Sequence, residues 1–342
     1  MEWKKLRLET TTAALDYLGA IAMELGLEGF EIEDNVPLTA EEKERLFIDI
    51  LPELPEDKGI AYVSFYVEPE RDEKELEKEL KKSVEDYAEL CDFGAMKLEV
   101  SVEDDENWIN NWKEFFKPFR IDESIIIKPT WVEYAKGSIP YDDGTIPSNE
   151  AADKETVIEI DPGTAFGSGA HETTKLCILA LKKYLKSGDS VLDLGCGSGI
   201  LSIASMKLGA KLAFGVDIDE IAVDTSVENS KVNGISAQRC DKTVIPAAGT
   251  MAFVQGNVLS DDALCSDLKS FDADIVIANI LADVIIPLSA KAGEFMKKGG
   301  YFISSGIIDT KEDDVKKAVL ENGFEIVEVI RMNDWVSIVA RK

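Results

Sequence analysis

The residues VLDLGCGSGILSIA, at positions 191–204, limit the possible folds of this chain more than any other stretch. The mostly apolar run 191–194 leads into three alternate glycines, Gly195, Gly197 and Gly199, and an apolar helical pattern begins at Ile200. Because glycine has no Cβ, the backbone of such a turn comes close to a ligand, and the next helix aims its N-terminus at that ligand. The stretch therefore predicts a strand, a turn and a helix that together bind a molecule.

The spacing of the glycines separates the candidate ligands. A dinucleotide-binding turn has the pattern G-x-G-x-x-G or ends in alanine, whereas Ile200 occupies that last position here. A Walker A loop needs Gly-Lys followed by Ser or Thr, which occurs nowhere in the sequence. The pattern G-x-G-x-G preceded by Asp193 is instead the one associated with S-adenosylmethionine, which becomes the expected cofactor.

Alternating elements extend from residue 156 to the C-terminus. Such alternation, with glycine turns, predicts an α/β fold with a doubly wound, mostly parallel, Rossmann-like sheet. The last two strands, 324–330 and 335–340, are joined by four residues, so they form a hairpin and the last strand runs antiparallel. The other expected strands are 156–160, 190–194, 212–216, 251–254, 275–278 and 301–304, and the expected helices are 175–184, 200–208, 220–232, 283–295 and 311–321.

Two residues at strand ends are candidates for the site. Asp217 follows the strand after the glycine turn, about 20 residues downstream, where an acid accepts hydrogen bonds from ribose hydroxyls. The alternative role of helix N-cap is filled better by Asp219. Asn279 ends the strand 275–278, where its side-chain carbonyl is placed to accept a hydrogen bond from a substrate amine. A turn-forming asparagine is the alternative.

The segment 161–174, DPGTAFGSGAHETT, is the least generic part of the chain. It is either an ordinary loop, with Glu172, Thr173 or Thr174 capping the next helix, or a lid that folds over the cofactor. It contains His171, the only histidine of the chain. No Asp or Ser stands at a spacing from His171 that would be recognised as a catalytic pair. This disfavours a role of His171 as general base.

Residues 1–103 predict a separate α+β domain. Apolar periodicity gives the order strand, helix, strand, strand, helix, strand, which is the split β-α-β arrangement of ferredoxin-like domains. The last of these strands is expected from the alternation of Met96, Leu98, Val100 and Val102. No catalytic constellation occurs in these residues, so a structural or docking role is expected.

Residues 104–118 predict a linker helix, and residues 119–342 the second domain. Pro118 ends the helix, and four aromatic residues share one of its faces: Trp108, Trp112, Phe115 and Phe116. This face is expected to pack on a neighbouring domain, and an aromatic platform for a ligand is the alternative. A hairpin over 119–131, with its turn at 122–124, is expected to open the second domain.

Composition limits the partners. With 37 Lys and Arg against 66 Asp and Glu, the net charge of −29 repels nucleic acid and attracts a basic partner such as a ribosomal protein. A soluble acidic protein without such a substrate also fits this charge. No run of about 18 apolar residues or signal-like start occurs, so a cytoplasmic protein without a membrane span is expected. The five cysteines form no Cys-x-x-Cys pair, so we expect free thiols and no metal.

The segment 161–174, the glycine turn at 193–199 and the residues Asn279-Ile280-Leu281-Ala282 together resemble the PrmA family, the methyltransferases of ribosomal protein L11. The linker helix is also similar to that of the family. The resemblance implies a class I methyltransferase fold behind an N-terminal domain that recognises the ribosomal protein. It further implies transfer of methyl groups from S-adenosylmethionine to lysine side chains and to an N-terminal amine.

The resemblance also implies the site residues by position. Thr174, Gly195, Asp217 and Asn279 are expected to bind the cofactor, and Asn279 also faces the incoming amine as the catalytic residue. Phe166 and Gly167 are expected in the loop around cofactor and substrate, and Asp193 and Gly197 join the cofactor-binding set from the glycine turn.

The chain departs from the family pattern in three places. Glu172 replaces the usual proline of His-Pro-Thr-Thr, the N-terminal domain is longer than that of some members, and residues 235–250 are expected to be an insertion. That insertion shifts the positions at which the family's adenine-facing residue would be matched, and Asn257 is the candidate for that residue. Two other functions stay open: a methyltransferase of the same fold with another protein or small-molecule substrate, and a non-catalytic S-adenosylmethionine-binding protein of the ribosome.

Overall fold

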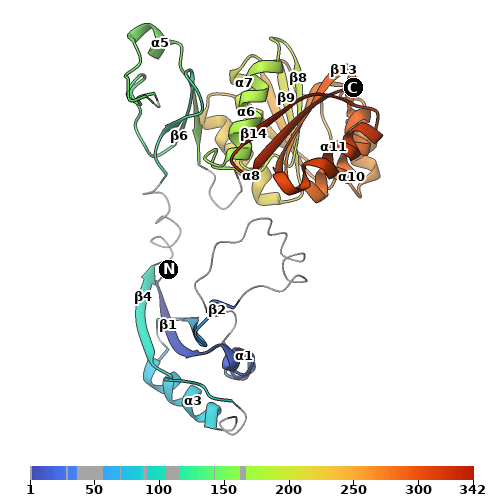
Figure 1. The fold of residues 1–342 in the computed structure, drawn as a ribbon. Helices are drawn as coiled ribbons and strands as arrows, with labels where there is room; N and C mark the ends of the chain where they lie inside the picture. The colour runs from blue at the N-terminus through green and yellow to red at the C-terminus, as the bar shows by residue number, and fades with distance from the viewer. Residues whose placement is uncertain are drawn as a thin grey trace. The chain divides into compact units, whose positions relative to one another are not determined.

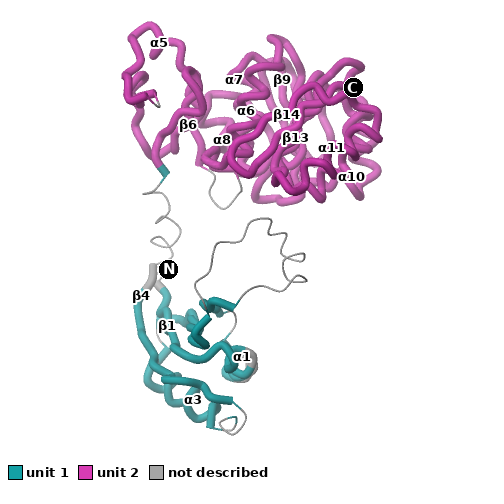
Figure 2. Tube along the Cα trace, viewed as in Figure 1, with its two compact units in different colours: residues 1–116 teal, residues 117–342 magenta. Residues whose placement is uncertain are grey.

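The computed structural model describes residues 2–27, 30–36, 57–69, 71–85, 87, 91–104, 116–141, 143–161 and 167–342. The chain divides into two compact units, residues 1–116 and 117–342 (Figure 2). Most of the expected linker helix, residues 105–115 with Trp108, Trp112 and Phe115, lies outside the described residues. The same holds for the expected site residue Phe166.

In its described residues, unit 1 forms a four-stranded antiparallel sheet with two helices. Its strands lie in the order β2-β3-β1-β4, so the first and second strands are separated by the third, as the split β-α-β arrangement requires. Met96 was expected in the last strand, but its φ of 49° is left-handed, and the strand begins two residues later. The elements are β1 (Glu2–Thr11), α1 (Leu15–Glu24), β2 (Phe30–Glu33), β3 (Ile60–Val67), α3 (Glu73–Glu85) and β4 (Leu98–Asp104).

Alternation along the strands builds the core of unit 1. Leu6 and Leu8 of β1 lie beside Phe65 and Val63 of β3, in paired positions of the antiparallel ladder. Since alternate residues of a strand face the same side, these side chains form one apolar sheet face. Leu18 and Ile21 of α1 and Leu76 and Leu80 of α3 are fully buried in the same cluster.

Unit 2 contains an eight-stranded sheet in the order β10-β11-β9-β8-β12-β13-β15-β14 (Figure 1). Strand β15 pairs antiparallel with both of its neighbours, and the pairs from β10 to β13 are parallel, which confirms the expected doubly wound sheet with an antiparallel last strand. The strands are β8 (Ser190–Leu194), β9 (Leu212–Asp217), β10 (Ser236–Cys240), β11 (Thr250–Gln255), β12 (Ala273–Asn279), β13 (Met296–Ile308), β14 (Glu325–Met332) and β15 (Trp335–Arg341).

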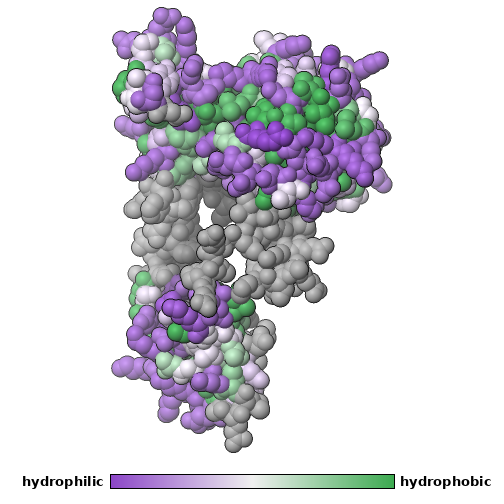
Figure 3. Space-filling view, in the orientation of Figure 1, coloured by the Kyte–Doolittle hydropathy of each residue, from purple (hydrophilic) through white to green (hydrophobic). Residues whose placement is uncertain are grey.

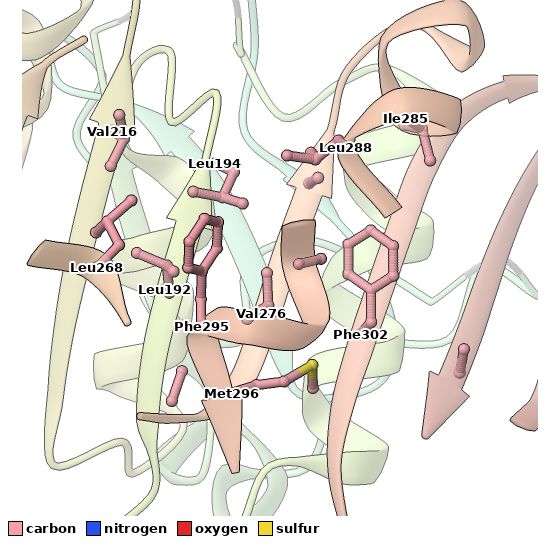
Figure 4. Close-up of a cluster of buried hydrophobic side chains, with 14 of the residues drawn as sticks. Leu192, Leu194, Val216, Leu268, Val276, Ile285, Leu288, Phe295, Met296 and Phe302 are labelled. Carbon is pink, nitrogen blue, oxygen red and sulfur yellow. The ribbon is translucent and has the colours of Figure 1, made fainter. Parts of the chain in front are cut away.

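Helices cover both faces of this sheet. In Figure 1, α6 (Glu172–Tyr184), α7 (Ile200–Lys207) and α8 (Glu220–Val232) lie on one side. The other side is covered by α9 (Asp262–Leu268), α10 (Ala282–Ala292) and α11 (Glu312–Glu321). Their apolar side chains join alternate strand residues in one buried cluster, in which Leu192, Val276 and Phe302 face Leu268, Ile285 and Leu288 (Figure 4). Burial on both faces is what a central parallel sheet requires.

Some elements of unit 2 differ from the expectation. Strand β10 and helix α9 were not expected, and β10 lies within residues 235–250 as the edge strand of the sheet. Its sequence, SAQRC, has no apolar alternation because none of its side chains is buried. Helix α6 begins at Glu172, three residues before the expected start at Lys175.

Strand β7 (Thr156–Ile160) does not belong to the large sheet. It pairs in parallel with β6 (Ile125–Pro129), which also forms a hairpin with β5 (Phe119–Arg120), so the three strands make a separate small sheet. The expected turn is present, and Asp122 Oδ1 accepts hydrogen bonds from the backbone N–H groups of Ser124 and Ile125, at 2.8 and 2.9 Å. A short helix, α5 (Asn149–Asp153), precedes β7.

None of the helices in the described residues is long and apolar enough to cross a membrane. All five cysteines are free thiols, as expected.

Candidate functional site

The register of three parallel strands brings the candidate residues into one row. Leu194 of β8 pairs with Val216 of β9, so the next residues, Gly195 and Asp217, lie side by side. On the other side of β8, Asp193 pairs with Ile277 of β12, which places Asn279 beside the same turn. The row lies at the carboxyl ends of the strands, the edge at which doubly wound sheets bind their ligands.

The three glycines of the turn have left-handed backbone conformations. Their φ angles are 82° at Gly195, 53° at Gly197 and 80° at Gly199, which L-residues rarely adopt. A Cβ on Gly195 would lie 2.5 Å from Cγ2 of Ile280, and one on Gly199 would lie 2.9 Å from Oγ of Ser226. Both conformation and space therefore require glycine at these two positions, and the helix α7 starts directly after them.

The carboxylate of Asp217 holds the turn. Its Oδ2 accepts a hydrogen bond from the N–H of Gly197 at 2.8 Å, and its Oδ1 accepts one from the N–H of Asp219 at 3.0 Å. The N-cap of α8 is Asp219, whose Oδ1 accepts from the N–H of Ile221 at 2.9 Å, so the helix cap is not Asp217. Each carboxylate oxygen of Asp217 retains a further lone pair for a ligand.

Asp193 lies on β8, two residues before Gly195, and its carboxyl is fully buried. Its Oδ2 accepts hydrogen bonds from the hydroxyl of Ser202 at 2.7 Å and from the N–H of Ser202 at 3.1 Å. Its Oδ1 is buried without a hydrogen-bond partner among the described residues. Burial, reinforced by the charge of Asp217 and only partly offset by Ser202, raises the pKa of Asp193 to about 7. Such an unsatisfied acceptor marks a position where a ligand can donate a hydrogen bond.

Asn279 also has a buried side-chain oxygen without a hydrogen-bond partner among the described residues. Its Nδ2 donates to Oγ1 of Thr174 at 3.2 Å, which fixes the orientation of the amide. Its Oδ1 is buried and has no partner among the described residues. Thr174 lies in the first turn of α6 and is itself buried, so it contacts the site through Asn279. The pair leaves one oriented carbonyl acceptor next to the glycine turn.

The end of the loop that precedes α6 is held from two directions. The hydroxyl of Ser198, in the glycine turn, donates to the carbonyl of Gly167 at 2.6 Å. His171 is the N-cap of α6, and its Nδ1 accepts from the N–H of Thr173 at 3.3 Å. The cap is therefore not Glu172, Thr173 or Thr174, because all three lie within the first turn of α6. The same ring makes an edge contact with Trp335, with 4.8 Å between the ring centroids.

Asn257 is exposed and belongs to a turn. It stands two residues after Gln255, the partner of Asp217 in the ladder between β11 and β9. Its Oδ1 accepts from the N–H of Leu259 at 2.9 Å. The residue thus lies beyond the carboxyl end of β11, and its role toward adenine stays a prediction.

Two further residues of the site were not expected from the sequence. Ser226 and Asn229, three positions apart on α8, donate to the carbonyls of Gly197 and Ser198, both at 2.9 Å. The signal in the sequence is weak, since it consists of polar residues on a helix face that also carries Ala222 and Val223. Their partners are 29 and 31 residues away along the chain.

The described residues contain no group of three or more His, Cys, Asp or Glu that could hold a metal ion. What the site offers is a glycine turn, an acid at the end of the neighbouring strand and two unsatisfied carbonyl-type acceptors. Together with the strand order and the antiparallel last strand, this arrangement defines a class I methyltransferase.

The chain belongs to the PrmA family of ribosomal protein L11 methyltransferases, because the model of that family matches residues 2–342. It is 52% identical over 344 residues to the ribosomal protein L11 methyltransferase of Lachnoclostridium phytofermentans, which covers 100% of this chain and 99% of that protein. The protein of the same name from Agathobacter rectalis is 45% identical over 346 residues, with the same coverage. A crystal structure of the ribosomal protein L11 methylase of Lactobacillus delbrueckii subsp. bulgaricus has 28% identity and a TM-score of 0.53 and covers 66% of this chain and 100% of that one.

Proposed function

We propose that this enzyme transfers methyl groups from S-adenosylmethionine to lysine side-chain amines and to the N-terminal amine of ribosomal protein L11. Family membership supports the substrate, since the relatives carry that name. The observation that carries the chemistry is the buried Oδ1 of Asn279, an oriented acceptor without a partner among the described residues, beside the glycine turn.

The residues present fit S-adenosylmethionine. Gly195 has a left-handed φ of 82° and no Cβ, so the backbone of the glycine turn stays open to the close approach of a ligand. Asp193 and Asn279 each keep a buried oxygen without a partner in the described part of the chain, and the cofactor carries donors for such oxygens. Asp217 has the position and the free lone pairs to accept hydrogen bonds from ribose hydroxyls. Gly167, Phe166 and Asn257 are proposed to complete the cofactor site.

When bound, S-adenosylmethionine supplies a methyl group that its sulfonium already activates. Asn279 accepts an N–H of the substrate amine and thereby orients the nitrogen lone pair, so positioning supplies much of the rate gain. The amine must be neutral, and a lysine of ordinary pKa, about 10.4, is almost fully protonated at pH 7. Removal from water in the site favours its neutral form. Because His171 serves as a helix cap, we assign the loss of the amine proton to water before the transfer.

Unit 1 and the net charge of −29 fit the recognition of a basic ribosomal protein. The segment 161–174 is proposed to close over the cofactor, and its end is already held by Ser198. A ribosomal substrate supports a cytoplasmic location, which is part of this proposal.

The test is the variant Asn279→Ala, assayed with labelled S-adenosylmethionine and unmodified ribosomal protein L11, with intact mass as the readout. Loss of the oriented acceptor should lower the transfer rate by about 100-fold or more, the usual effect of removing one polar group aimed at the reacting atoms. Binding of S-adenosylhomocysteine, measured by calorimetry, should weaken far less. The control is Asn322→Ala, since Asn322 donates to Ser289 and Ala318 at the end of α11 and should leave transfer unchanged.

The outcomes separate the parts of the proposal. Full transfer by Asn279→Ala would remove the residue from the chemistry. Wild-type protein that binds S-adenosylhomocysteine but adds no mass to L11 would keep the cofactor and exclude the substrate. Wild-type protein that binds neither would exclude the cofactor as well.

A further inference from the structure

Asn229 joins two segments of the site that are far apart in the sequence. Its side chain projects from α8 and is only 2% exposed. Oδ1 accepts a hydrogen bond from the N–H of Asp161 at 2.9 Å, and Nδ2 donates to the carbonyl of Asp161 at 3.0 Å. The second proton of Nδ2 is donated to the carbonyl of Ser198 at 2.9 Å. One amide therefore connects Asp161 with the glycine turn.

Gly167, which precedes α6, is hydrogen-bonded to the same residue of the turn. The hydroxyl of Ser198 donates to the carbonyl of Gly167 at 2.6 Å. The fit is close, because a Cβ on Gly167 would lie 2.7 Å from that hydroxyl oxygen. Asp161 and Gly167, the residues on either side of 162–166, are thus both tied to Ser198, the first through Asn229 and the second directly.

We propose that Asn229 is a positioning residue for methyl transfer, which holds Asp161 and the glycine turn together at the cofactor site. This inference rests on the proposed function, since both segments are assigned to the cofactor there. Asn229 itself lies beneath the backbone that it bonds and acts through Asp161 and Ser198.

Only an amide satisfies the three partners of Asn229. The two carbonyl oxygens, on Asp161 and Ser198, need two N–H donors, and the N–H of Asp161 needs an acceptor. Among short side chains, asparagine alone supplies both, whereas a hydroxyl has one proton and a carboxylate has none. A carboxylate at this buried position would face two carbonyl oxygens without a donor between them, an arrangement that costs more than the simple loss of a hydrogen bond.

Asn233 offers a matched control one helical turn further on. Its Oδ1 accepts from the N–H of Glu159 at 3.0 Å, and its Nδ2 donates to the carbonyl of Glu159 at 2.6 Å. The pattern on the backbone is the same as that of Asn229 on Asp161. The difference is that the remaining proton of Asn233 goes to the carbonyl of Asn229, within the helix, and not to the glycine turn.

The experiment compares Asn229→Asp with Asn233→Asp in the full chain. We expect Asn229→Asp to raise both the dissociation constant of S-adenosylhomocysteine and the KM for S-adenosylmethionine by about tenfold or more, the effect of leaving one buried polar group unpaired. Asn233→Asp should change both by less than about threefold. Hydrogen exchange adds a local readout: S-adenosylhomocysteine should slow exchange in peptides over 167–171 and over the glycine turn of wild type and Asn233→Asp, and not of Asn229→Asp.

A general loss of stability would act differently, because it would lower the active fraction of both variants and leave the KM of the folded fraction unchanged. Equal effects of the two variants on KM and on exchange would therefore overturn the inference. If Asn229→Asp does not fold, Asn229→Ser, which keeps one donor, replaces it. The expected rise in the dissociation constant and in KM is then in the same direction but smaller. The wild-type transfer to L11 is measured alongside, so failure of the proposed function is recognised separately.

Discussion

At the scale of residues, Asp193 is a carboxyl group of the site whose ionised form is disfavoured by burial. Its carboxyl is fully buried, one of its oxygens has no partner in the described residues, and its pKa is raised to about 7. A carboxyl whose pKa is higher in the folded than in the unfolded state stabilises the fold only while it is protonated. This contribution is complete below the unfolded pKa, near 4, and is lost as the pH rises through 7.

The variant Asp193→Asn tests this argument. The amide keeps the shape and an acceptor for Ser202, but it carries no charge. At pH 8 it should unfold at a temperature at least about 2 °C above wild type, the shift that roughly 1 kcal/mol produces in a unit of this size. The gain should shrink toward pH 4, and affinity for S-adenosylhomocysteine should fall. Thermal unfolding from pH 4 to 8 measures it, and a difference independent of pH would contradict the assignment.

Parallel sheets bind ligands at the carboxyl ends of their strands, and this rule allowed part of the candidate site to be predicted from the sequence. Gly195, Asp217 and Asn279 each stand at a strand end, and the register of β9, β8 and β12 brings them together as the sequence indicated. Asn229 could not be found in this way. Its role depends on Asp161 and Ser198, which are 68 and 31 residues away, and no local pattern records that contact.

At the scale of elements, local pattern predicted which segments are strands but not which strands pair. Strand β7 has the apolar alternation of a sheet strand, and that alternation is the same whether it joins the large sheet or the small one. Partner choice is set by tertiary contacts, here those of β6. Strand β10 was missed for a related reason, because an exposed edge strand needs no apolar face.

A buried ion pair holds the small sheet together. The guanidinium of Arg120, on β5, contacts Glu155, and both side chains are almost completely buried. The second carboxylate oxygen of Glu155 accepts from the hydroxyl of Tyr134 at 2.7 Å and from the N–H of Gly137 at 2.9 Å. Burial opposes the charge of Glu155, but these bonds outweigh it and hold its pKa below the ordinary value. Burial and the same carboxylate raise the pKa of Tyr134 to about 12.

The variant Glu155→Gln leaves the charge of Arg120 buried without its partner. It should lower the free energy of unfolding by about 3 kcal/mol or more, as is usual when one member of a buried pair is removed. Urea unfolding at pH 7 measures the change. The control is Glu150→Gln, since the pair of Glu150 with Lys154 is exposed and should contribute less than about 0.5 kcal/mol. Equal midpoints for the two variants would rule out a stabilising role for the buried pair.

At the scale of the whole molecule, the most pronounced property is the excess of negative charge. The sequence carries 66 acidic against 37 basic residues, a net charge of −29. Figure 3 shows hydrophilic residues over much of the viewed face of unit 2, with hydrophobic groups gathered between them. A surface of one sign raises the rate at which a partner of the opposite sign arrives, and salt removes that advantage.

The proposed basic substrate should therefore show a strong salt dependence. Between about 0.05 and 0.5 M NaCl, where the Debye length falls from more than 10 Å to roughly 4 Å, kcat/KM for L11 should drop by about tenfold or more. Affinity for S-adenosylhomocysteine should change little over the same range. Steady-state kinetics at saturating cofactor measures the first and calorimetry the second. A kcat/KM for L11 that is insensitive to salt would show that the acidic surface does not guide the substrate.

Asn229 and Asn233 also close an edge of the small sheet. Strand β7 pairs with β6 on one side only, and on the other side the two asparagines occupy the N–H and C=O groups of Asp161 and Glu159. The opposite edge, β5, is only two residues long. An open edge strand is a template on which a second polypeptide can add, and this is a common start of aggregation. Two side chains from α8 and its C-terminal cap thus occupy backbone groups with which an additional strand could pair, so this end of β7 is protected from a foreign strand.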